Sequence, residues 1–190
     1  MEISEIAAGA ALAISVYNLW QSLKRAKLKV FVPPVVGYSS PYQNSNFEVF
    51  EVPVTLVNEG ARAGIVLAID LEVTDPRTRV TKRFYAADFG RWTMTRTRSG
   101  AYEPFAPISV PGNASTPKTV LFYTRGPEEP NEIVREPGPY DFRLTLDDGR
   151  GGARRPSVTF TRALRFYDAR AFQEGTLAMY APDWRTSVND

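Results

Sequence analysis

The stretch Ile65-Val66-Leu67-Ala68-Ile69-Asp70-Leu71-Glu72-Val73-Thr74 shows the clearest period of two in this chain of 190 residues. Its odd-numbered positions are apolar, and its even-numbered positions from 68 onward are small or polar. Successive side chains of a β-strand point to opposite faces, so the stretch predicts a strand with one buried face. The turn-forming sequence Asp75-Pro76-Arg77-Thr78 follows it.

Weaker forms of this alternation recur along the chain. Expected strands cover residues 28–32, 47–56, 65–74, 79–85, 119–124, 140–146 and 158–164, with a less regular one at 89–97. Residues 37–46, 104–112 and 126–138 carry the residues typical of connections. With 15 Pro, 13 Gly and no helical pattern between the strands, the sequence favours an all-β fold. We expect an antiparallel β-sandwich of about seven strands, preceded by an N-terminal helix.

Three motifs carry a resemblance at the level of the fold: Val57-Asn58-Glu59-Gly60, Val110-Pro111-Gly112 and Gly138-Pro139-Tyr140-Asp141-Phe142. Over residues 27–166 their order resembles the immunoglobulin-like sandwich. The whole chain resembles bacterial proteins with one N-terminal membrane helix and a cytoplasmic domain of that kind. Tyr140 lies where such a domain would have its tyrosine corner, whereas the Cys–Trp–Cys hallmark of antibody domains is absent. The resemblance implies a fold and no function.

The N-terminal stretch 3–23 is apolar, and it has no charged residue from position 6 to position 20. As a helix of 21 residues it would measure about 31 Å, close to the thickness of the lipid hydrocarbon. We therefore predict a single-pass membrane anchor, in which the aromatic residues lie at the basic end. The predicted anchor residues are Ile6, Leu12, Ile14, Tyr17, Trp20, Lys24 and Arg25.

Other interpretations of this helix fit less well. A signal peptide would have basic residues first, and a helix lying on the membrane surface would have a wide polar face. A helix buried against a protein partner stays open, because the uncharged core of 15 residues is short for a span. Basic residues follow the apolar run and none precedes it, which predicts that the bulk of the chain is cytoplasmic.

The sequence thus suggests three parts. Residues 1–26 form the anchor and its basic flank, and residues 27–166 form the sandwich. Residues 167–190 form a tail, with a short helix expected at 168–179. We expect Met179, Tyr180 and Trp184 to pack on the sandwich, and the last residues to be loose.

A basic segment lies between residues 77 and 98, where Asp88 is the one acidic residue and aromatic residues are interleaved. This pattern predicts a surface that binds an anionic membrane or an acidic protein partner, and less readily a nucleic acid. The simpler alternative is a solvated edge strand, because charged residues discourage edge-to-edge aggregation. The residues of this predicted anion surface are Arg77, Arg79, Lys82, Arg83, Arg91, Arg96 and Arg98.

The composition argues against common enzyme chemistry. The chain has no Cys and no His, which excludes disulfides, thiolate nucleophiles and the usual general base near neutral pH. The acidic loop 126–138 and the Asp-Asp-Gly turn at 147–149 have the pattern of solvated loops and turns. We predict no catalytic residue, cofactor or metal site.

Function is expected to be non-enzymatic. We expect a membrane-anchored binding or scaffold module that presents its domain to membrane lipid or to a protein partner. The alternative is a structural subunit of a larger assembly, with the N-terminal helix buried against partner subunits. An enzyme that uses carboxylates would need two acids in one concave pocket.

Overall fold

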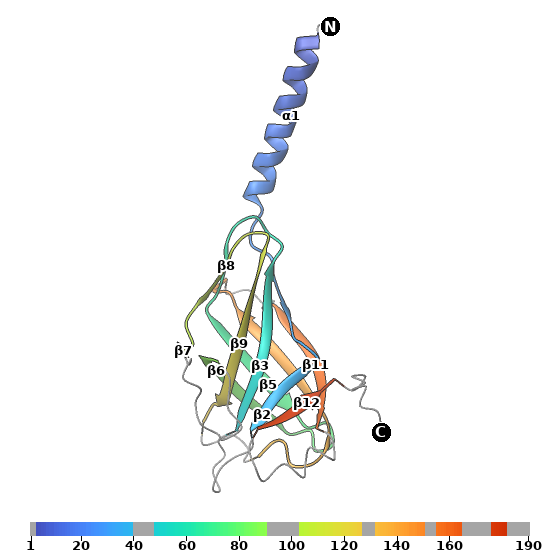
Figure 1. Ribbon diagram of the computed structural model, residues 1–190, viewed down its shortest axis with the longest axis vertical. Coiled ribbons are helices and arrows are strands. Elements are labelled where there is room, and N and C mark those ends of the chain that lie inside the picture. Colours follow the sequence, from blue (N-terminus) through green and yellow to red (C-terminus); the bar gives the residue numbers. More distant parts are fainter. Residues whose placement is uncertain are drawn as a thin grey trace.

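The computed structural model describes residues 3–39, 48–90, 103–126, 132–150, 155–164 and 176–181. One helix stands apart from a compact β-domain (Figure 1). The elements are α1 (Ile3–Leu23), β1 (Leu28–Phe31), β2 (Val35–Ser39), β3 (Val49–Asn58), β4 (Gly64–Val66), β5 (Ala68–Thr74), β6 (Thr81–Phe89), β7 (Glu103–Pro104), β8 (Ile108–Val110), β9 (Ala114–Thr124), β10 (Gly138–Asp147), β11 (Ser157–Leu164) and β12 (Thr176–Tyr180).

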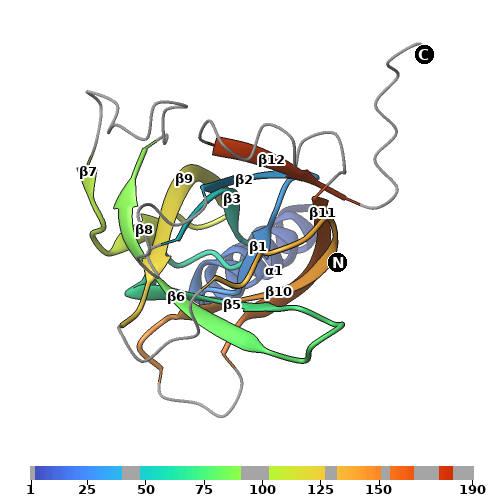
Figure 2. The same ribbon diagram turned by 90° about the horizontal axis from the view of Figure 1, so that it is seen from below.

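Most of these strands form one antiparallel sheet that curls into a nearly closed barrel (Figure 2). The ring runs β3-β2-β12-β11-β10-β5-β6-β9, and β9 returns to pair with β3. β1 and β2 share one edge of β3, because β1 pairs with its last residues and β2 with its first. The short strands β4 and β8 form a separate pair.

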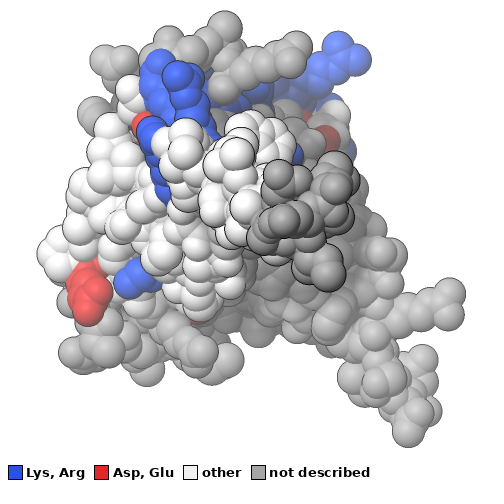
Figure 3. All heavy atoms as spheres, turned by 90° about the horizontal axis from the view of Figure 1, so that it is seen from above, with Lys and Arg blue, Asp and Glu red and all other residues white. Residues whose placement is uncertain are grey.

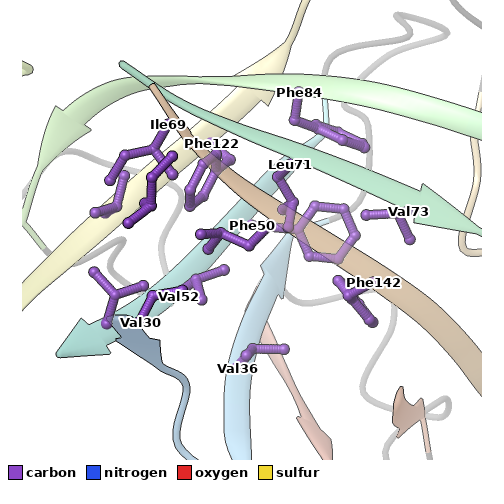
Figure 4. Close-up of a cluster of buried hydrophobic side chains, with 14 of the residues drawn as sticks. Val30, Val36, Phe50, Val52, Ile69, Leu71, Val73, Phe84, Phe122 and Phe142 are labelled. Atoms are coloured by element: carbon purple, nitrogen blue, oxygen red, sulfur yellow. The ribbon is translucent and has the colours of Figure 1, made fainter. Parts of the chain in front are cut away.

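The barrel interior is filled by the apolar faces of the alternating strands. On β3, Phe50, Val52, Val54 and Leu56 are all at most 2% exposed, as the period of two predicts. The ring of Phe50 lies at the centre of this core (Figure 4), with centroids 4.9 Å from Phe84 and 5.4 Å from Phe142. Buried aromatic rings of this kind supply much of the apolar area that stabilises a small domain.

The all-β antiparallel prediction is confirmed, whereas the immunoglobulin-like sandwich is not. β9 pairs with β3 on one side and with β6 on the other, so it joins edges that a sandwich leaves apart. On the opposite side β12 bridges β2 and β11. Hydrogen bonding between neighbouring strands therefore continues around the domain, which gives a barrel-like arrangement.

Several boundaries differ from the prediction. Residues 35–39 form β2, although 37–46 were expected to be a connection, and residues 176–180 form β12 in place of the end of a helix. Both pair along their length with each other, which supplies backbone partners that the local sequence does not reveal. The expected burial of Met179 is confirmed, because it is 0% exposed. Trp184 and residues 91–97 lie outside the described residues.

The stretch from 65 to 74 is not one uninterrupted strand. β4 ends at Val66, and the backbone N–H of Leu67 donates to the carbonyl oxygen of Asp147 before β5 begins. The residues that face the interior change there from even-numbered to odd-numbered positions. Val66 and Ile69 are buried, whereas Ile65 and Leu67 are 47% and 44% exposed. The prediction that Ile65 and Leu67 share the buried face of Ile69 is therefore wrong.

Two arginine side chains form hydrogen bonds across the part of the barrel where the pairing between strands is weakest. Between β11 and β12 one residue pair is matched, and β1 and β11 share no ladder in the described part of the chain. Arg162 donates to the carbonyl oxygen of Pro33 at 2.5 Å, and Arg150 donates to that of Ala26 at 2.9 Å. These bonds tie the β10–β11 side of the barrel to the segment that leads away from α1.

Tyr140 makes the local contact expected of a tyrosine corner. Its hydroxyl donates to the carbonyl oxygen of Glu136, four residues earlier, at 2.7 Å. It also accepts a hydrogen bond of 2.6 Å from Arg77, whose guanidinium pairs with Asp75 at 2.9 Å. The motif is thus present at the start of β10, although the sandwich that it usually accompanies is not confirmed.

Candidate functional site

The most unusual surface of the molecule is the helix α1, which projects from one end of the barrel (Figure 1). The sequence favours this helix, because Ala is its commonest residue, Leu recurs along it and it contains no Pro. Side chains are described from residue 7 onward, and every one from 7 to 20 is exposed. The large apolar ones are between 50% and 67% exposed: Leu12, Ile14, Val16, Tyr17, Leu19, Trp20 and Leu23.

Apolar side chains lie on several sides of α1 rather than along one stripe. A surface helix of a globular domain turns its apolar stripe onto the core, and a helix that is apolar around most of its circumference is normally covered by lipid or by protein. Among the described residues, no helix is both long enough and apolar enough to cross a membrane. The prediction of a membrane-spanning helix is therefore not supported.

A buried side-chain amide helps to connect α1 to the barrel. The side chain of Asn58, at the end of β3, is 1% exposed. Its Oδ1 accepts hydrogen bonds of 3.0 Å from the backbone N–H groups of Lys27 and Gly60. Its Nδ2 donates to the carbonyl oxygens of Arg62 and Val110, at 2.8 and 3.1 Å. Asn58 thus connects the segment after α1 with the turn after β3 and the end of β8.

Close backbone packing reinforces this junction. A Cβ atom at Gly60 would lie 2.0 Å from the carbonyl oxygen of Arg25, and one at Gly112 would lie 1.8 Å from that of Ala61. The backbone N–H of Asn113 donates to the carbonyl oxygen of Gly60 at 2.9 Å. Only glycine fits these two approaches. The exit of α1 is therefore packed against the turn after β3, and that turn is packed against the one before β9.

Several basic residues lie at the base of α1, directly after its last residue. Lys24, Arg25, Lys27 and Lys29 are all exposed, and the Lys24 ammonium lies 4.4 Å from the ring centroid of Trp20. Lys27 and Lys29 both pair with Glu59. Hydrogen bonds from Lys29 and Lys27 lower the pKa of the Glu59 carboxyl, which therefore stays charged near neutral pH.

The predicted anion surface is only partly a surface in the structure. Lys82 is 0% exposed, so its inclusion was wrong. Arg77 belongs to the tyrosine corner, and Arg83 pairs with Glu72 at 3.1 Å. Arg79 is exposed in the turn between β5 and β6. Arg91, Arg96 and Arg98 lie outside the described residues, and the binding role of this segment stays a prediction.

A buried ion pair lies at the end of the barrel away from α1. Lys82 Nζ is 2.5 Å from Glu48 Oε2, and both side chains are 0% exposed. The same carboxylate accepts bonds from the Tyr38 hydroxyl at 2.6 Å and from the backbone N–H of Ile133 at 3.0 Å. Burial, and then the charge of Glu48, raise the pKa of Tyr38, so its hydroxyl keeps the proton that it donates. This cluster holds the segment before β10 against the barrel.

Two acidic residues line one depression of the described surface, and both have partners. A depression of about 530 Å³ on the outer face of the sheet is lined in part by Glu72 and Asp141. Glu72 pairs with Arg83, and Asp141 accepts a hydrogen bond of 2.8 Å from Thr161. Within the described ranges, no group of acidic side chains is arranged to hold a metal ion.

The structure brings together most of the predicted anchor residues and adds others. Leu12, Ile14, Tyr17 and Trp20 all lie exposed on α1, next to Lys24 and Arg25. The side chain of Ile6 lies outside the described residues. In the sequence, Asn58 is notable only as part of the Val57–Gly60 motif and Arg62 is not notable at all, because their proximity to α1 arises only in the folded chain.

Comparisons with known proteins give only distant likenesses. No protein-family model and no curated protein matches the chain. The ApaA protein from Bordetella pertussis has 14% identity over 85% of this chain and 98% of its own, with a TM-score of 0.30. A lipoprotein from Bacillus subtilis has 16% identity over 80% of this chain and 41% of its own, with a TM-score of 0.38. A β-glucosidase from intestinal bacteria has 19% identity over 73% of this chain and 16% of its own, with a TM-score of 0.31. Because these TM-scores are low, the likeness extends only to a fold that is rich in β-strands.

Proposed function

We propose that this chain is a non-enzymatic attachment module, in which α1 docks onto a lipid membrane and the barrel is the binding domain held there. One observation carries the proposal: the large apolar side chains of α1 are at least half exposed along the helix. Burying a Leu, Ile or Val side chain that was in water contributes about 1.5–3 kcal/mol. Several such side chains on one projecting element provide a strong driving force for entering lipid.

The order of residues along α1 supports lipid as the apolar environment. Tyr17 and Trp20 lie near its C-terminal end, and aromatic rings of this kind prefer the boundary between lipid and water. Lys24 and Arg25 follow directly, where headgroups would meet them. In this arrangement the apolar part of α1 enters the lipid, and its basic end stays with the barrel at the surface.

The junction at Asn58 supports a fixed presentation of the barrel. Because the amide joins Lys27 to two turns of the barrel, α1 and the β-domain are not connected by a free linker. The end of the barrel opposite α1 would then point away from the membrane (Figure 1).

Vesicle flotation of the full chain tests the proposal. The wild type is expected to float with phosphatidylcholine vesicles, and the double variant Leu12→Gln/Leu19→Gln is expected to bind at least about tenfold more weakly, because two apolar contacts with lipid are lost. The control Phe31→Gln/Val80→Gln removes two apolar side chains of the barrel that are 56% and 39% exposed. It should float like the wild type. A wild-type chain that stays unbound with every vesicle composition would contradict the proposal.

The alternative, a structural subunit with α1 packed on other helices, has one observation in its favour. Leu12, Val16, Leu19 and Leu23 follow the spacing of four, three and four residues that is typical of a coiled-coil seam. This function predicts a stable oligomer in detergent-free buffer that dissociates in Leu12→Gln/Leu19→Gln. Sedimentation equilibrium measures that directly, and a monomer at all concentrations would exclude self-assembly through this seam.

A further inference from the structure

We propose that the base of α1 is a binding site for anionic lipid headgroups, formed by Lys24, Arg25 and Arg62. We call these three residues the root cluster. The inference rests on the proposed docking of α1 and goes further, since it names the class of lipid. It also places the anion-binding surface at the helix end of the barrel rather than on the segment from 77 to 98.

The fold brings the root cluster together from two segments of the chain. Arg62 follows β3, and its backbone N–H donates to the carbonyl oxygen of Lys24 at 3.2 Å. The buried amide of Asn58 holds the same turn, because it donates to the carbonyl oxygen of Arg62 at 2.8 Å. The position of Arg62 beside the helix exit is thus fixed by hydrogen bonds to the backbone. All three side chains of the root cluster are exposed.

The charges of the root cluster are not neutralised within the described residues. No ion pair there involves Lys24, Arg25 or Arg62. By contrast, Lys27 pairs with Glu59 at 3.0 Å, and Arg150 pairs with Asp148 at 3.4 Å. Viewed from the helix end, Lys and Arg side chains gather on part of the rim, and acidic atoms occupy little of this face (Figure 3).

The root cluster is also where headgroups would be. Lys24 and Arg25 come directly after the last residue of α1, so they reach the headgroup layer once the apolar helix enters lipid. Basic residues at that depth are attracted by the negative surface potential of an anionic membrane, and this attraction falls off within a Debye length. Arg79 is at the other end of β5 from the base of α1. The start of β5 pairs with Asp147, and Arg150, just after it, donates to the carbonyl oxygen of Ala26 near α1, whereas Arg79 follows the end of β5.

The test compares two vesicle types and two matched double variants of the full chain. The vesicles are phosphatidylcholine alone and equal parts of phosphatidylcholine and phosphatidylserine. Arg25→Gln/Arg62→Gln removes two charges of the root cluster, and Arg79→Gln/Arg135→Gln removes two exposed charges elsewhere. Circular dichroism establishes that both variants are folded.

We expect the wild type to bind the anionic vesicles more tightly than the neutral ones, and added salt to reduce the difference. Arg25→Gln/Arg62→Gln should lower the affinity for anionic vesicles about 25-fold, at about fivefold per basic residue, and leave the affinity for neutral vesicles unchanged. Arg79→Gln/Arg135→Gln should behave like the wild type.

Three results would overturn the inference: equal binding of the wild type to both vesicle types, equal losses in the two double variants, or a salt-insensitive preference. In each of these the chain still binds vesicles, so the docking of α1 stands while the choice of lipid fails. Absence of binding to either vesicle type would instead refute the docking itself.

Discussion

Replacing Lys82 with methionine is expected to lower the free energy of unfolding by about 3–5 kcal/mol. Lys82 and Glu48 form an ion pair in which both side chains are 0% exposed. Removing the ammonium leaves a buried carboxylate without its counter-charge, and the lost interaction cannot be replaced by water. Urea denaturation followed by circular dichroism measures the change.

Two controls make this expectation specific. Arg83→Met removes one partner of the surface pair with Glu72 and should cost no more than about 1 kcal/mol. The double variant Lys82→Met/Glu48→Gln removes both buried charges but keeps an oxygen for the backbone N–H of Ile133, so it should be more stable than Lys82→Met alone. Equal costs for Lys82→Met and Arg83→Met would contradict the burial of the pair.

Replacing Asn58 with alanine is expected to cost about 3 kcal/mol or more and to loosen the base of α1. The substitution leaves the backbone N–H groups of Lys27 and Gly60, and the carbonyl oxygens of Arg62 and Val110, without their side-chain partner. Each buried polar group that loses its hydrogen bond costs about 1–3 kcal/mol. Thermal unfolding measures the total, and amide hydrogen exchange at Lys27 and Gly60 measures the local effect.

Asn58→Asp provides the matched control for the junction. It keeps an oxygen that can accept from Lys27 and Gly60 but removes the donor to Arg62 and Val110. We therefore expect protection of the two amides to be retained better than in Asn58→Ala. If hydrogen exchange at Lys27 is unchanged in Asn58→Ala, the side-chain amide of Asn58 does not connect α1 to the barrel.

The strands were predictable wherever a clean alternation of apolar and polar residues is present. Phe142, Leu144 and Leu146 are buried as their period of two predicts, and α1 covers the expected range. β2 and β12 were not predictable, because they are short and stabilised by pairing with each other rather than by a local pattern. Closure of the sheet through β9 likewise depends on pairings between distant residues.

Three charged residues are buried at positions where the alternating pattern would place apolar residues. Lys82 and Arg162 are buried on β6 and β11, two residues from Phe84 and Phe160, and Glu48 is buried just before β3, two residues from Phe50. A charged residue at an apolar position of the period indicates a buried partner, and here Glu48 and Lys82 are that partner for each other. Which charges pair could not be predicted, because Glu48 precedes β3 and Lys82 lies on β6, and no local pattern brings these two segments together.

The candidate site likewise contains residues that the sequence predicts and one residue that it does not. Exposed apolar residues of α1 and the basic residues after it follow directly from the sequence, since they are consecutive. Arg62 could not be assigned to this site, because the turn after β3 reaches the base of α1 only in the folded chain, through the hydrogen bonds of Asn58 and of the Arg62 backbone. Lys82 was assigned to the wrong environment because a basic cluster in sequence was taken for a basic surface.

Fluorescence of Trp20 tests the membrane docking of α1 most directly. In the variant Trp92→Phe/Trp184→Phe, Trp20 is the sole tryptophan of the chain. With vesicles that contain lipids brominated along their acyl chains, we predict quenching of Trp20, strongest for bromines near the headgroups, because Trp20 lies close to the basic end of the helix. An emission spectrum that stays unquenched and unshifted by vesicles, in a chain whose barrel is folded, would contradict the account.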